Sequence, residues 1–196
     1  MIRAFIAIDL PDDVRDALSE AQALLKRAHT AVKVSWTKID NLHLTLQFLG
    51  YVEEEAIAKI GAGLEAVAGQ QTRFELPVAG AGAFPSAKRP RVLWVGCDDQ
   101  AGNLKALAHG VQAAMEPLGF ASEHREFAGH LTLGRVKLPR PDAALTRALD
   151  SINNQTFGTM RFTGIHLFES QLHPQGSIYT KLSSHDLRGT QHAGQD

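Results

Sequence analysis

Cysteine is almost absent from this chain of 196 residues, and Cys97 alone cannot form an internal disulfide. A disulfide-stapled secreted framework is therefore excluded, and a reducing, cytoplasmic compartment is expected. Long hydrophobic runs are also missing. The apolar start of the chain is interrupted by Asp9 and Pro11 before it could act as a signal peptide, and no stretch approaches the roughly 20 residues of a membrane span. We expect a cytoplasmic protein with no membrane contact.

An excess of charge of either sign is lacking as well, because 20 Lys and Arg residues stand against 21 Asp and Glu, for a formal net charge of −1. This balance argues against a protein that coats long nucleic acid through bulk counterion release, so any phosphate contact must be local. Hydrophobic residues make up 44% of the chain and charged residues 21%, far from the composition of disordered proteins. The length favours one compact domain or two closely packed lobes.

Several motifs of known chemistry are also absent. There is no glycine-rich loop followed by Lys and Ser or Thr for nucleotide phosphates, and no lysine motif for adenylylation. An ATP-driven ligase is therefore disfavoured, and no nucleotide cofactor is expected. The histidines outside the motifs described below show no ligand spacing on one helix, and no cysteine cluster supports zinc, so no metal is expected either.

Hydrophobic periodicity predicts a mixed order of helices and strands. Apolar residues at three- and four-residue steps predict helices near 12–29, 56–67, 104–118 and 142–151, and apolar or alternating runs predict strands near 3–9, 32–36, 41–49, 73–78, 92–97, 130–136, 156–168 and 177–183. The order does not alternate as in a doubly wound parallel sheet, so we expect an α+β fold with mainly antiparallel sheets. We expect a single domain over 1–185 and a polar, frayed tail over 186–196.

The sharpest feature is a repeated tetrapeptide, His-Leu-Thr-Leu, at 43–46 and again at 130–133. Each copy opens a predicted strand, in which residues two apart face the same side. Each copy therefore projects an imidazole and a hydroxyl from one face and anchors two leucines in the core. Since the two copies are 87 positions apart, the repeat suggests an internal duplication that supplies two matching half-sites.

Two such half-sites suit the cleavage of a phosphoester without a metal. One imidazole can remove a proton from the attacking oxygen while the other protonates the leaving oxygen, and an ordinary histidine pKa of about 6.5 allows both roles near neutral pH. The hydroxyls of Thr45 and Thr132 would donate hydrogen bonds to the phosphate oxygens. The alternative for a single copy is a hydrogen-bonded surface pair with no catalytic role. Core packing explains the repeated leucines, however, but not a repeated His and Thr on the opposite face.

With these motifs, the sequence resembles the 2H phosphoesterases and, within them, the RNA 2′,3′-cyclic phosphodiesterases that are also called 2′-5′ RNA ligases. The resemblance covers most of the chain. It is carried by RAFIAIDLP at 3–11, NLHLTLQFLG at 41–50, RVLWVG at 91–96, FAGHLTLGR at 127–135 and GSIY at 176–179. It implies a bilobal fold in which two mainly antiparallel sheets with flanking helices are related by a pseudo-twofold axis around a central cleft.

The resemblance also implies an activity, the opening of RNA-terminal 2′,3′-cyclic phosphates to 2′-phosphates, with possible 2′-5′ ligation in reverse. It implies that His43 is the proton donor and His130 the proton acceptor, and that Thr45 and Thr132 bind phosphate. The expected partners are RNA ends or nucleoside 2′,3′-cyclic phosphates, and we expect a monomer. The sequence departs from the family at Gly129, where proline is common. Glycine loosens the approach of the strand to His130.

Further site residues are predicted on weaker grounds. Arg135 follows His130 by five positions and has the wrong parity for the cleft face, so it reaches the phosphate only if a bulge near Gly134 re-aims it. The resemblance supports that role, and the alternative is a solvated arginine. Phe48 has the parity of the leucines and is predicted to be buried.

Other aromatic and basic residues are less informative. Trp36, Phe84 and Tyr179 could stack on a base, but core packing is the default for such rings. The basic cluster at 88–91 could steer an RNA backbone, although a soluble loop is favoured.

Two other classes of function remain open. One is a non-catalytic module that binds nucleotides or RNA ends in the same cleft. The other is a metallohydrolase that uses the two motif histidines as ligands. Loss of turnover with retained binding in histidine variants would exclude the first, and indifference to chelators would exclude the second.

Overall fold

The computed structural model describes residues 1–28, 31–121, 126–174 and 176–189, and the fold is α+β, as expected. The α-helices are α1 (Asp12–Arg27), α2 (Ile57–Ala68), α3 (Asn103–Met115) and α4 (Ala143–Ile152), and short 3-10 turns are η1 (Ile39–Asn41), η2 (Glu54–Ala56) and η3 (Glu116–Leu118). The strands are β1 (Ile2–Ile8), β2 (Val34–Trp36), β3 (Leu44–Val52), β4 (Phe74–Phe84), β5 (Val92–Cys97), β6 (His130–Val136), β7 (Thr156–Phe162), β8 (Gly164–Gln171) and β9 (Ile178–Asp186).

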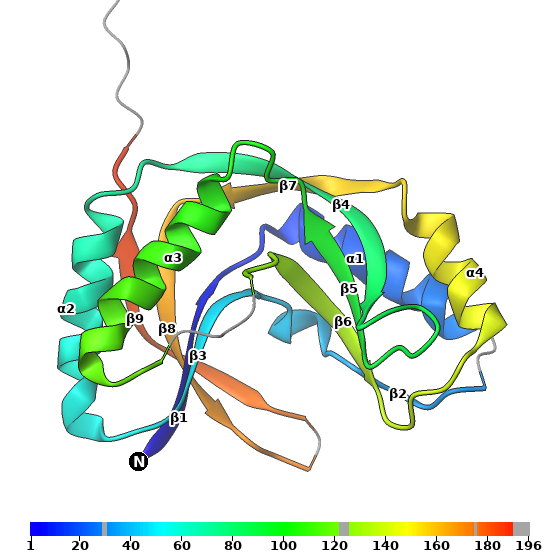
Figure 1. Ribbon diagram of the computed structural model, residues 1–196, viewed down its shortest axis with the longest axis horizontal. Helices are drawn as coiled ribbons and strands as arrows, with labels where there is room; N and C mark the ends of the chain where they lie inside the picture. Colours follow the sequence, from blue (N-terminus) through cyan, green and yellow to red (C-terminus); the bar gives the residue numbers. More distant parts are fainter. Residues whose placement is uncertain (29–30, 122–125, 175, 190–196) are drawn as a thin grey trace, which may run out of the picture.

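The strands form one sheet in the order β7-β4-β5-β6-β3-β1-β8-β9, with β2 added beside β6, and each of these pairs is antiparallel. The sheet is strongly curled, and its two ends form two lobes (Figure 1). We call β3, β1, β8 and β9, with α2 and α3, the first lobe. We call β6, β5, β4, β7 and β2, with α1 and α4, the second lobe.

The two halves of the sheet are paired through one pair of residues. Leu44 of β3 lies opposite Leu131 of β6, and this is the only registered pair between the two strands. Both leucines are fully buried. The sequence predicted two sheets, but the structure has one continuous sheet with two halves. The halves are joined only by the Leu44–Leu131 pair, and both leucines belong to the repeated motifs.

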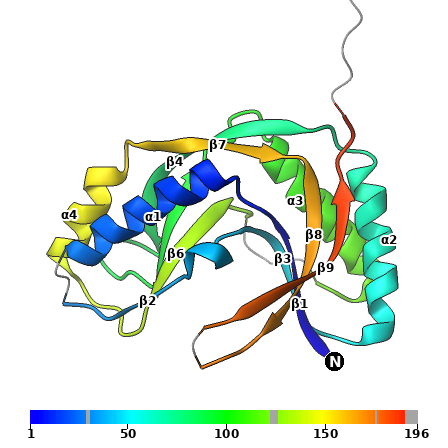
Figure 2. The same cartoon turned by 180° about the vertical axis from the view of Figure 1, so that it is seen from behind.

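The helices are exchanged between the lobes. Helix α1 follows β1 of the first lobe but packs against β7 and α4, whereas α3 follows β5 of the second lobe but packs against α2 and β3. Figure 2 shows α1 lying along the back of the second lobe beside α4. Pro11 and the acidic Asp12 and Asp13 begin α1, where acidic groups suit the positive end of a helix. The last helical residue is Arg27, and the predicted end near residue 29 lies outside the described residues.

Several element boundaries differ from the sequence prediction. Gly50 was expected to end the third strand, but β3 passes through Gly50 in a left-handed conformation (φ 75°) and ends at Val52. The predicted strand over 156–168 is two strands, β7 and β8, with Thr163 between them. The predicted tail begins three residues too early, because Asp186 closes β9, Leu187 is buried and Arg188 forms a bridge with Thr72. The rest of that tail, 190–196, lies outside the described residues. Among the described residues, no helix is both long and apolar enough to span a membrane.

Candidate active site

The two repeated motifs lie side by side at the joint between the lobes. In an antiparallel pair, the residues that flank Leu44 and Leu131 project from the face opposite the two leucines. This register places His43 across from Thr132, and Thr45 across from His130. Since all four side chains line the same cleft of about 210 Å³, the strands bring the half-sites together as the sequence predicts.

Both imidazoles are oriented by the same kind of hydrogen bond to the backbone. The Nδ1 atom of His43 lies 2.7 Å from the carbonyl oxygen of Asn41, and the Nδ1 atom of His130 lies 2.7 Å from the carbonyl oxygen of Ala128. A carbonyl oxygen can only accept, so each Nδ1 carries the proton and donates it to the residue two positions earlier. This leaves Nε2 of each ring as the atom available to a ligand.

Aromatic rings enclose both imidazoles, but to different degrees. His43 lies 4.7 Å from the Phe5 ring and 5.2 Å from Tyr179, and His130 lies 5.1 Å from Phe84, between ring centroids. Burial lowers the pKa of His43 below its ordinary value, and the positive charge of Arg135 acts in the same direction. The Asn41 carbonyl and the carboxylate of Asp9 oppose this shift without cancelling it.

Arg135 also lines the cleft, because a bulge reverses the alternation of β6. The register between β5 and β6 passes from Leu93 opposite Gly134 to Trp94 opposite Thr132, so Leu133 is an extra residue. An extra residue turns the following side chains to the opposite face. From the sequence, Arg135 was expected to reach the cleft only with a bulge, and this bulge is present.

An equivalent bulge in β3 makes the prediction for Phe48 wrong. Ile6 lies opposite Gln47, but Ala7 lies opposite Thr45, so Leu46 is the extra residue. Gln47 consequently takes the buried position, and Phe48 is 49% exposed and lines the cleft. Phe48 follows His43 by five positions, as Arg135 follows His130. The pseudo-twofold relation thus extends to these two side chains, one aromatic and one cationic.

Sequence reasoning missed part of the cleft wall. Arg3 lines the cleft, and its Nη1 donates to Ser170 Oγ at 3.2 Å. Asn41 lines it as well, and its amide donates to the Ser177 carbonyl oxygen at 2.6 Å. Strand alternation alone could not separate these residues from ordinary polar surface, since their partners come from the far end of the chain.

The aromatic residues that the sequence analysis named as possible stacking surfaces do not all line the cleft. Tyr179 lines the cleft and Phe84 contacts the His130 ring. Trp36 is packed against the core and lies under the Lys26 ammonium group, 5.5 Å from its ring centroid. Residues 88–91 belong to the connection between β4 and β5 and do not line the cleft.

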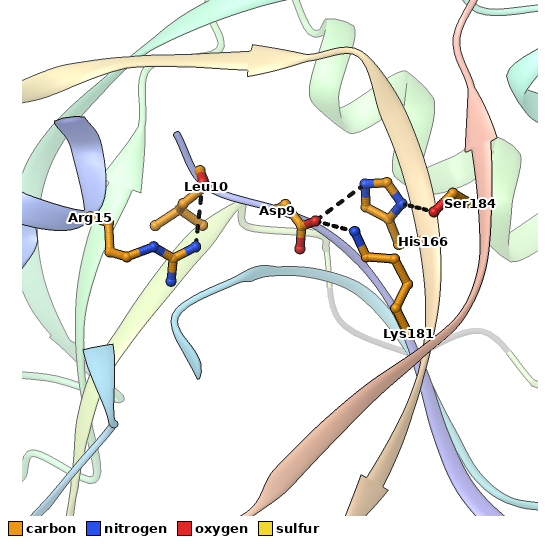
Figure 3. Close-up of polar contacts among 6 residues, drawn as sticks. All are labelled: Asp9, Leu10, Arg15, His166, Lys181 and Ser184. Carbon is orange, nitrogen blue, oxygen red and sulfur yellow. Dashed lines mark hydrogen bonds and ion pairs between the residues drawn. The ribbon is translucent and has the colours of Figure 1, made fainter. Parts of the chain in front are cut away.

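A polar cluster adjoins the site behind His43. Asp9 accepts a hydrogen bond from Lys181 Nζ, and its Oδ2 lies 3.6 Å from His166 Nε2, while His166 Nδ1 lies 2.9 Å from Ser184 Oγ (Figure 3). Asp9 and His43 both line a second hollow of about 110 Å³. Arg15 links the start of α1 to the turn before His43 through its hydrogen bonds to Leu10 and Ile39 carbonyl oxygens.

Gly129 has a clear neighbour. A Cβ atom at this position would lie 2.5 Å from Cδ2 of Leu104, which is buried in the first turn of α3. A real Cβ does not approach that closely, so the space that a proline ring would need is filled by α3. Glycine at position 129, in place of the family's usual proline, therefore leaves room for the Leu104 side chain of α3.

The described side chains offer no evident metal site. No group of three or more His, Cys, Asp and Glu side chains that could hold a metal ion occurs within residues 1–28, 31–121, 126–174 and 176–189. A zinc site normally takes three or four protein ligands. The two motif histidines therefore lack the partners that a metal site of this kind would require in the described part of the chain.

Comparison with known proteins agrees with this geometry. The family model for LigT like phosphoesterases matches twice, at residues 8–94 and 95–179, so each half contains one motif. A protein named RNA 2′,3′-cyclic phosphodiesterase from Archaeoglobus fulgidus is 36% identical over 181 residues, which is 92% of this chain and 98% of that protein. One of the same name from Methanothermobacter thermautotrophicus is 35% identical over 181 residues, or 92% and 96% of the two chains.

Solved structures show the same fold. The crystal structure of TT0787 of Thermus thermophilus has a TM-score of 0.79 at 31% identity and covers 96% of this chain and 100% of that one. Escherichia coli LigT complexed with 3′-AMP has a TM-score of 0.71 at 27% identity, with 95% and 98% covered. Since the family model spans most of the chain in two halves and the relatives cover nearly all of it, the chain belongs to the LigT-like phosphoesterase family, as the sequence resemblance implied.

Proposed function

We propose that this protein hydrolyses the 2′,3′-cyclic phosphate at an RNA end to a 2′-phosphomonoester, with His43 and His130 as acid and base. The observation that carries the proposal is the matched pair of imidazoles in one cleft, each with Nδ1 fixed on a carbonyl and Nε2 free. The curated relatives are named RNA 2′,3′-cyclic phosphodiesterase, which supports the substrate class. The structure of the related E. coli LigT is a complex with 3′-AMP, so a nucleotide binds to a protein of the same fold.

The proposed reaction is a single in-line displacement at phosphorus. The free Nε2 of His130 takes a proton from water as the water oxygen bonds to phosphorus. The bond from phosphorus to the 3′ oxygen breaks, and protonated His43 gives its Nε2 proton to that oxygen. The phosphate stays on the 2′ oxygen, and exchange of one proton with solvent restores both rings. An RNA 5′ hydroxyl in place of water would join a 2′-5′ linkage by the same steps, with its oxygen bonding to phosphorus as the 3′ oxygen leaves.

The remaining cleft side chains have distinct proposed roles. Thr45 and Thr132 donate hydrogen bonds to the non-bridging phosphate oxygens, and the Arg135 guanidinium neutralises the charge that develops on them. Phe48 offers its exposed ring for stacking on the terminal base, a contact typically worth about 1–3 kcal/mol. None of these steps uses a metal. Because the whole cleft comes from one chain, we also propose that the protein acts as a monomer, and the lone cysteine suits a cytoplasmic setting.

The test is turnover of a nucleoside 2′,3′-cyclic phosphate by His43→Ala and His130→Ala variants, with identification of the product. Each variant should lose about 10²–10⁴-fold in kcat, the usual contribution of one proton transfer. Binding of a nucleoside 2′-phosphate should stay within a few-fold of the wild type. His109→Ala is the matched control, since His109 is exposed on α3 and outside the cleft.

Three outcomes would contradict the proposal. Activity that survives both histidine changes would remove the acid and base. A 3′-phosphate product would reverse the assignment of the leaving oxygen. Loss of wild-type activity in EDTA, with recovery on added zinc or manganese, would favour the metallohydrolase instead.

A further inference from the structure

Positive charge is concentrated on three neighbouring strands of the second lobe. The segments 32–39, 84–97 and 130–141, which contain β2, β5 and β6 with their connections, include no Asp or Glu. They carry eight of the 20 basic residues of a chain that is nearly neutral overall. These basic residues are Lys33, Lys38, Lys88, Arg89, Arg91, Arg135, Lys137 and Arg140.

The fold gathers five of these residues at one end of the sheet. The Lys137 amide donates to the Lys33 carbonyl oxygen at 2.9 Å, and the Val136 amide donates to the Arg91 carbonyl oxygen at 2.9 Å. The start of β2, the start of β5 and the end of β6 therefore coincide, at the lower right in Figure 1. We call Lys33, Lys88, Arg89, Arg91 and Lys137 the basic edge.

The basic edge continues directly from the active site. Ser35 of β2 lies opposite Arg135 of β6. Lys33 and Lys137 lie two positions further along these strands, and residues two apart share a face. Both lysines consequently continue the face from which Arg135 reaches the cleft.

The side chains of the basic edge are available to a partner. All five are exposed, and none forms an ion pair within the described part of the chain. Lys105, Arg161 and Lys181, in contrast, each have a carboxylate partner. Uncompensated cations in one region repel one another, and an anion bound there removes that repulsion.

The corresponding end of the first lobe has the opposite charge. Strand β3, which the pseudo-twofold axis relates to β6, is followed by Glu53, Glu54 and Glu55, all exposed. A polyanion whose end occupies the cleft is therefore repelled from one end of the cleft and attracted to the other.

We propose that the basic edge binds the sugar–phosphate backbone of the RNA strand that leads to the cyclic end. This inference rests on the proposed function, which places the terminal phosphate of the RNA beside Arg135. The basic edge then binds the part of the RNA strand that precedes this phosphate. The expected consequence is a preference for oligoribonucleotides over single nucleotides, and this preference should weaken in salt. Sequence reading favoured a soluble loop at 88–91, but it could not place that loop beside Lys33 and Lys137.

The experiment compares two substrates in the Lys33→Gln/Lys137→Gln double variant. One substrate is an oligoribonucleotide ending in a 2′,3′-cyclic phosphate, and the other is the corresponding mononucleoside 2′,3′-cyclic phosphate. The matched control is Lys59→Gln/Arg147→Gln, which removes the same charge from exposed positions on α2 and α4. Each variant is also tested for binding of a labelled oligoribonucleotide with a 2′-phosphate end, a readout that does not depend on turnover.

The double variant should retain the wild-type kcat/KM for the mononucleotide and lose affinity for the oligonucleotide. Each phosphate neutralised on a single strand contributes a log–log salt slope of about −0.7. Raising the salt fourfold should therefore reduce wild-type oligonucleotide binding about sevenfold more than binding by the double variant. The control should behave like the wild type.

Equal oligonucleotide binding by wild type and double variant, or an unchanged salt slope, would overturn the inference while leaving the hydrolytic function intact. An equal loss on both substrates would also overturn it, because the lysines would then act on the site itself. If wild-type protein hydrolysed neither substrate, the proposed function would fail, and the binding comparison would still decide whether the basic edge holds RNA.

Discussion

Two buried glutamines have opposite hydrogen-bonding states. Gln22 is 1% exposed, and its Nε2 donates to the carbonyl oxygens of Thr37 and Leu133 at 2.8 and 3.0 Å. Gln47 is 2% exposed, and neither of its amide atoms has a partner among the described residues. Since Leu133 is the extra residue of the β6 bulge, the amide of Gln22 supports the turn that aims Arg135.

We predict that Gln47→Met raises the free energy of unfolding by about 1 kcal/mol or more, because the unpaired amide costs roughly 1–3 kcal/mol in a buried position. Gln22→Met should lower it by a similar amount, since two carbonyl oxygens lose a donor. Urea denaturation measures both values. A destabilised Gln47→Met variant would indicate that its amide is satisfied in solution, for instance by a buried water molecule.

The pH dependence of catalysis is predicted from the burial of His43. As the proton donor, His43 must be charged, so kcat/KM should fall as pH rises through its lowered pKa, and the alkaline limb should lie below the ordinary value of 6.5. The same shift costs stability in acid, because the folded state binds this proton less readily than the unfolded state and loses that contribution as pH falls below 6.5.

Tyr179→Ser tests the cause of the shift. Removing this ring admits water to His43, so its pKa should rise and the alkaline limb should move to higher pH. Tyr51→Ser is the control, because Tyr51 is 68% exposed and outside the cleft. An alkaline limb that stays in place in Tyr179→Ser, or moves to lower pH, would show that burial by Tyr179 does not set the protonation of the acid.

At the scale of single strands, the sequence predicts the core face better than the cleft face. Period-two alternation correctly buries Leu44 and Leu131 and brings each histidine beside a threonine. It fails at the bulge in both strands, because the extra residue at Leu46 or Leu133 arises from pairing with β1 or β5. A bulge is a property of two strands, so Phe48 was misplaced, and Arg135 was placed only on a condition.

The approach of β6 to the site depends on helix α3, through Gly129 and Leu104. We predict that Gly129→Ala lowers the free energy of unfolding by about 1–3 kcal/mol, the usual cost of overpacking. It should also lower kcat, since His130 is the next residue. Leu104→Ala should cost about 2–5 kcal/mol through the cavity it leaves.

A double-mutant cycle identifies the contact between these two residues. The Gly129→Ala/Leu104→Ala variant should be more stable than the sum of the two single changes implies, because the new methyl group then has room. Part of the lost kcat should return as well. Strict additivity of the two free energies would mean that Leu104 does not oppose a side chain at position 129. Urea denaturation and turnover of a nucleoside cyclic phosphate supply both measurements.

At the scale of the whole molecule, the sequence predicts two halves but not how they interlock. The repeated motifs and the α+β order are visible along the chain, whereas the exchange of α1 and α3 between the lobes is not. Amphipathic stripes such as Val14 and Leu18 show that a helix is packed on something, and they do not say which sheet receives it. The polar cluster of Asp9, His166 and Lys181 was missed for the same reason, because it joins residues that are far apart in sequence.

The exchange of helices predicts that neither lobe is stable without the other. Helix α1 separates β1 from its partner β3 in sequence but covers the second lobe, so unfolding of one lobe would expose the apolar face that packs on the other. The two tryptophans, Trp36 and Trp94, belong to β2 and β5 of the second lobe, so their fluorescence reports that lobe alone. Far-UV circular dichroism reports both lobes. We therefore expect the two signals to follow one urea transition with the same midpoint and slope.

A reporter in the first lobe completes this test. In a Trp36→Phe/Trp94→Phe background, Tyr51→Trp places the only indole at an exposed position of β3, and its transition should coincide with that of circular dichroism. Separate midpoints for the two reporters would mean that the lobes unfold independently and that the exchanged helices contribute little. A single transition would mean that the exchanged helices couple the stabilities of the two lobes, although Leu44 and Leu131 are the only registered pair between β3 and β6. Every folded molecule would then hold both motif histidines in one cleft, as transfer of one proton at each side of a phosphorus atom requires.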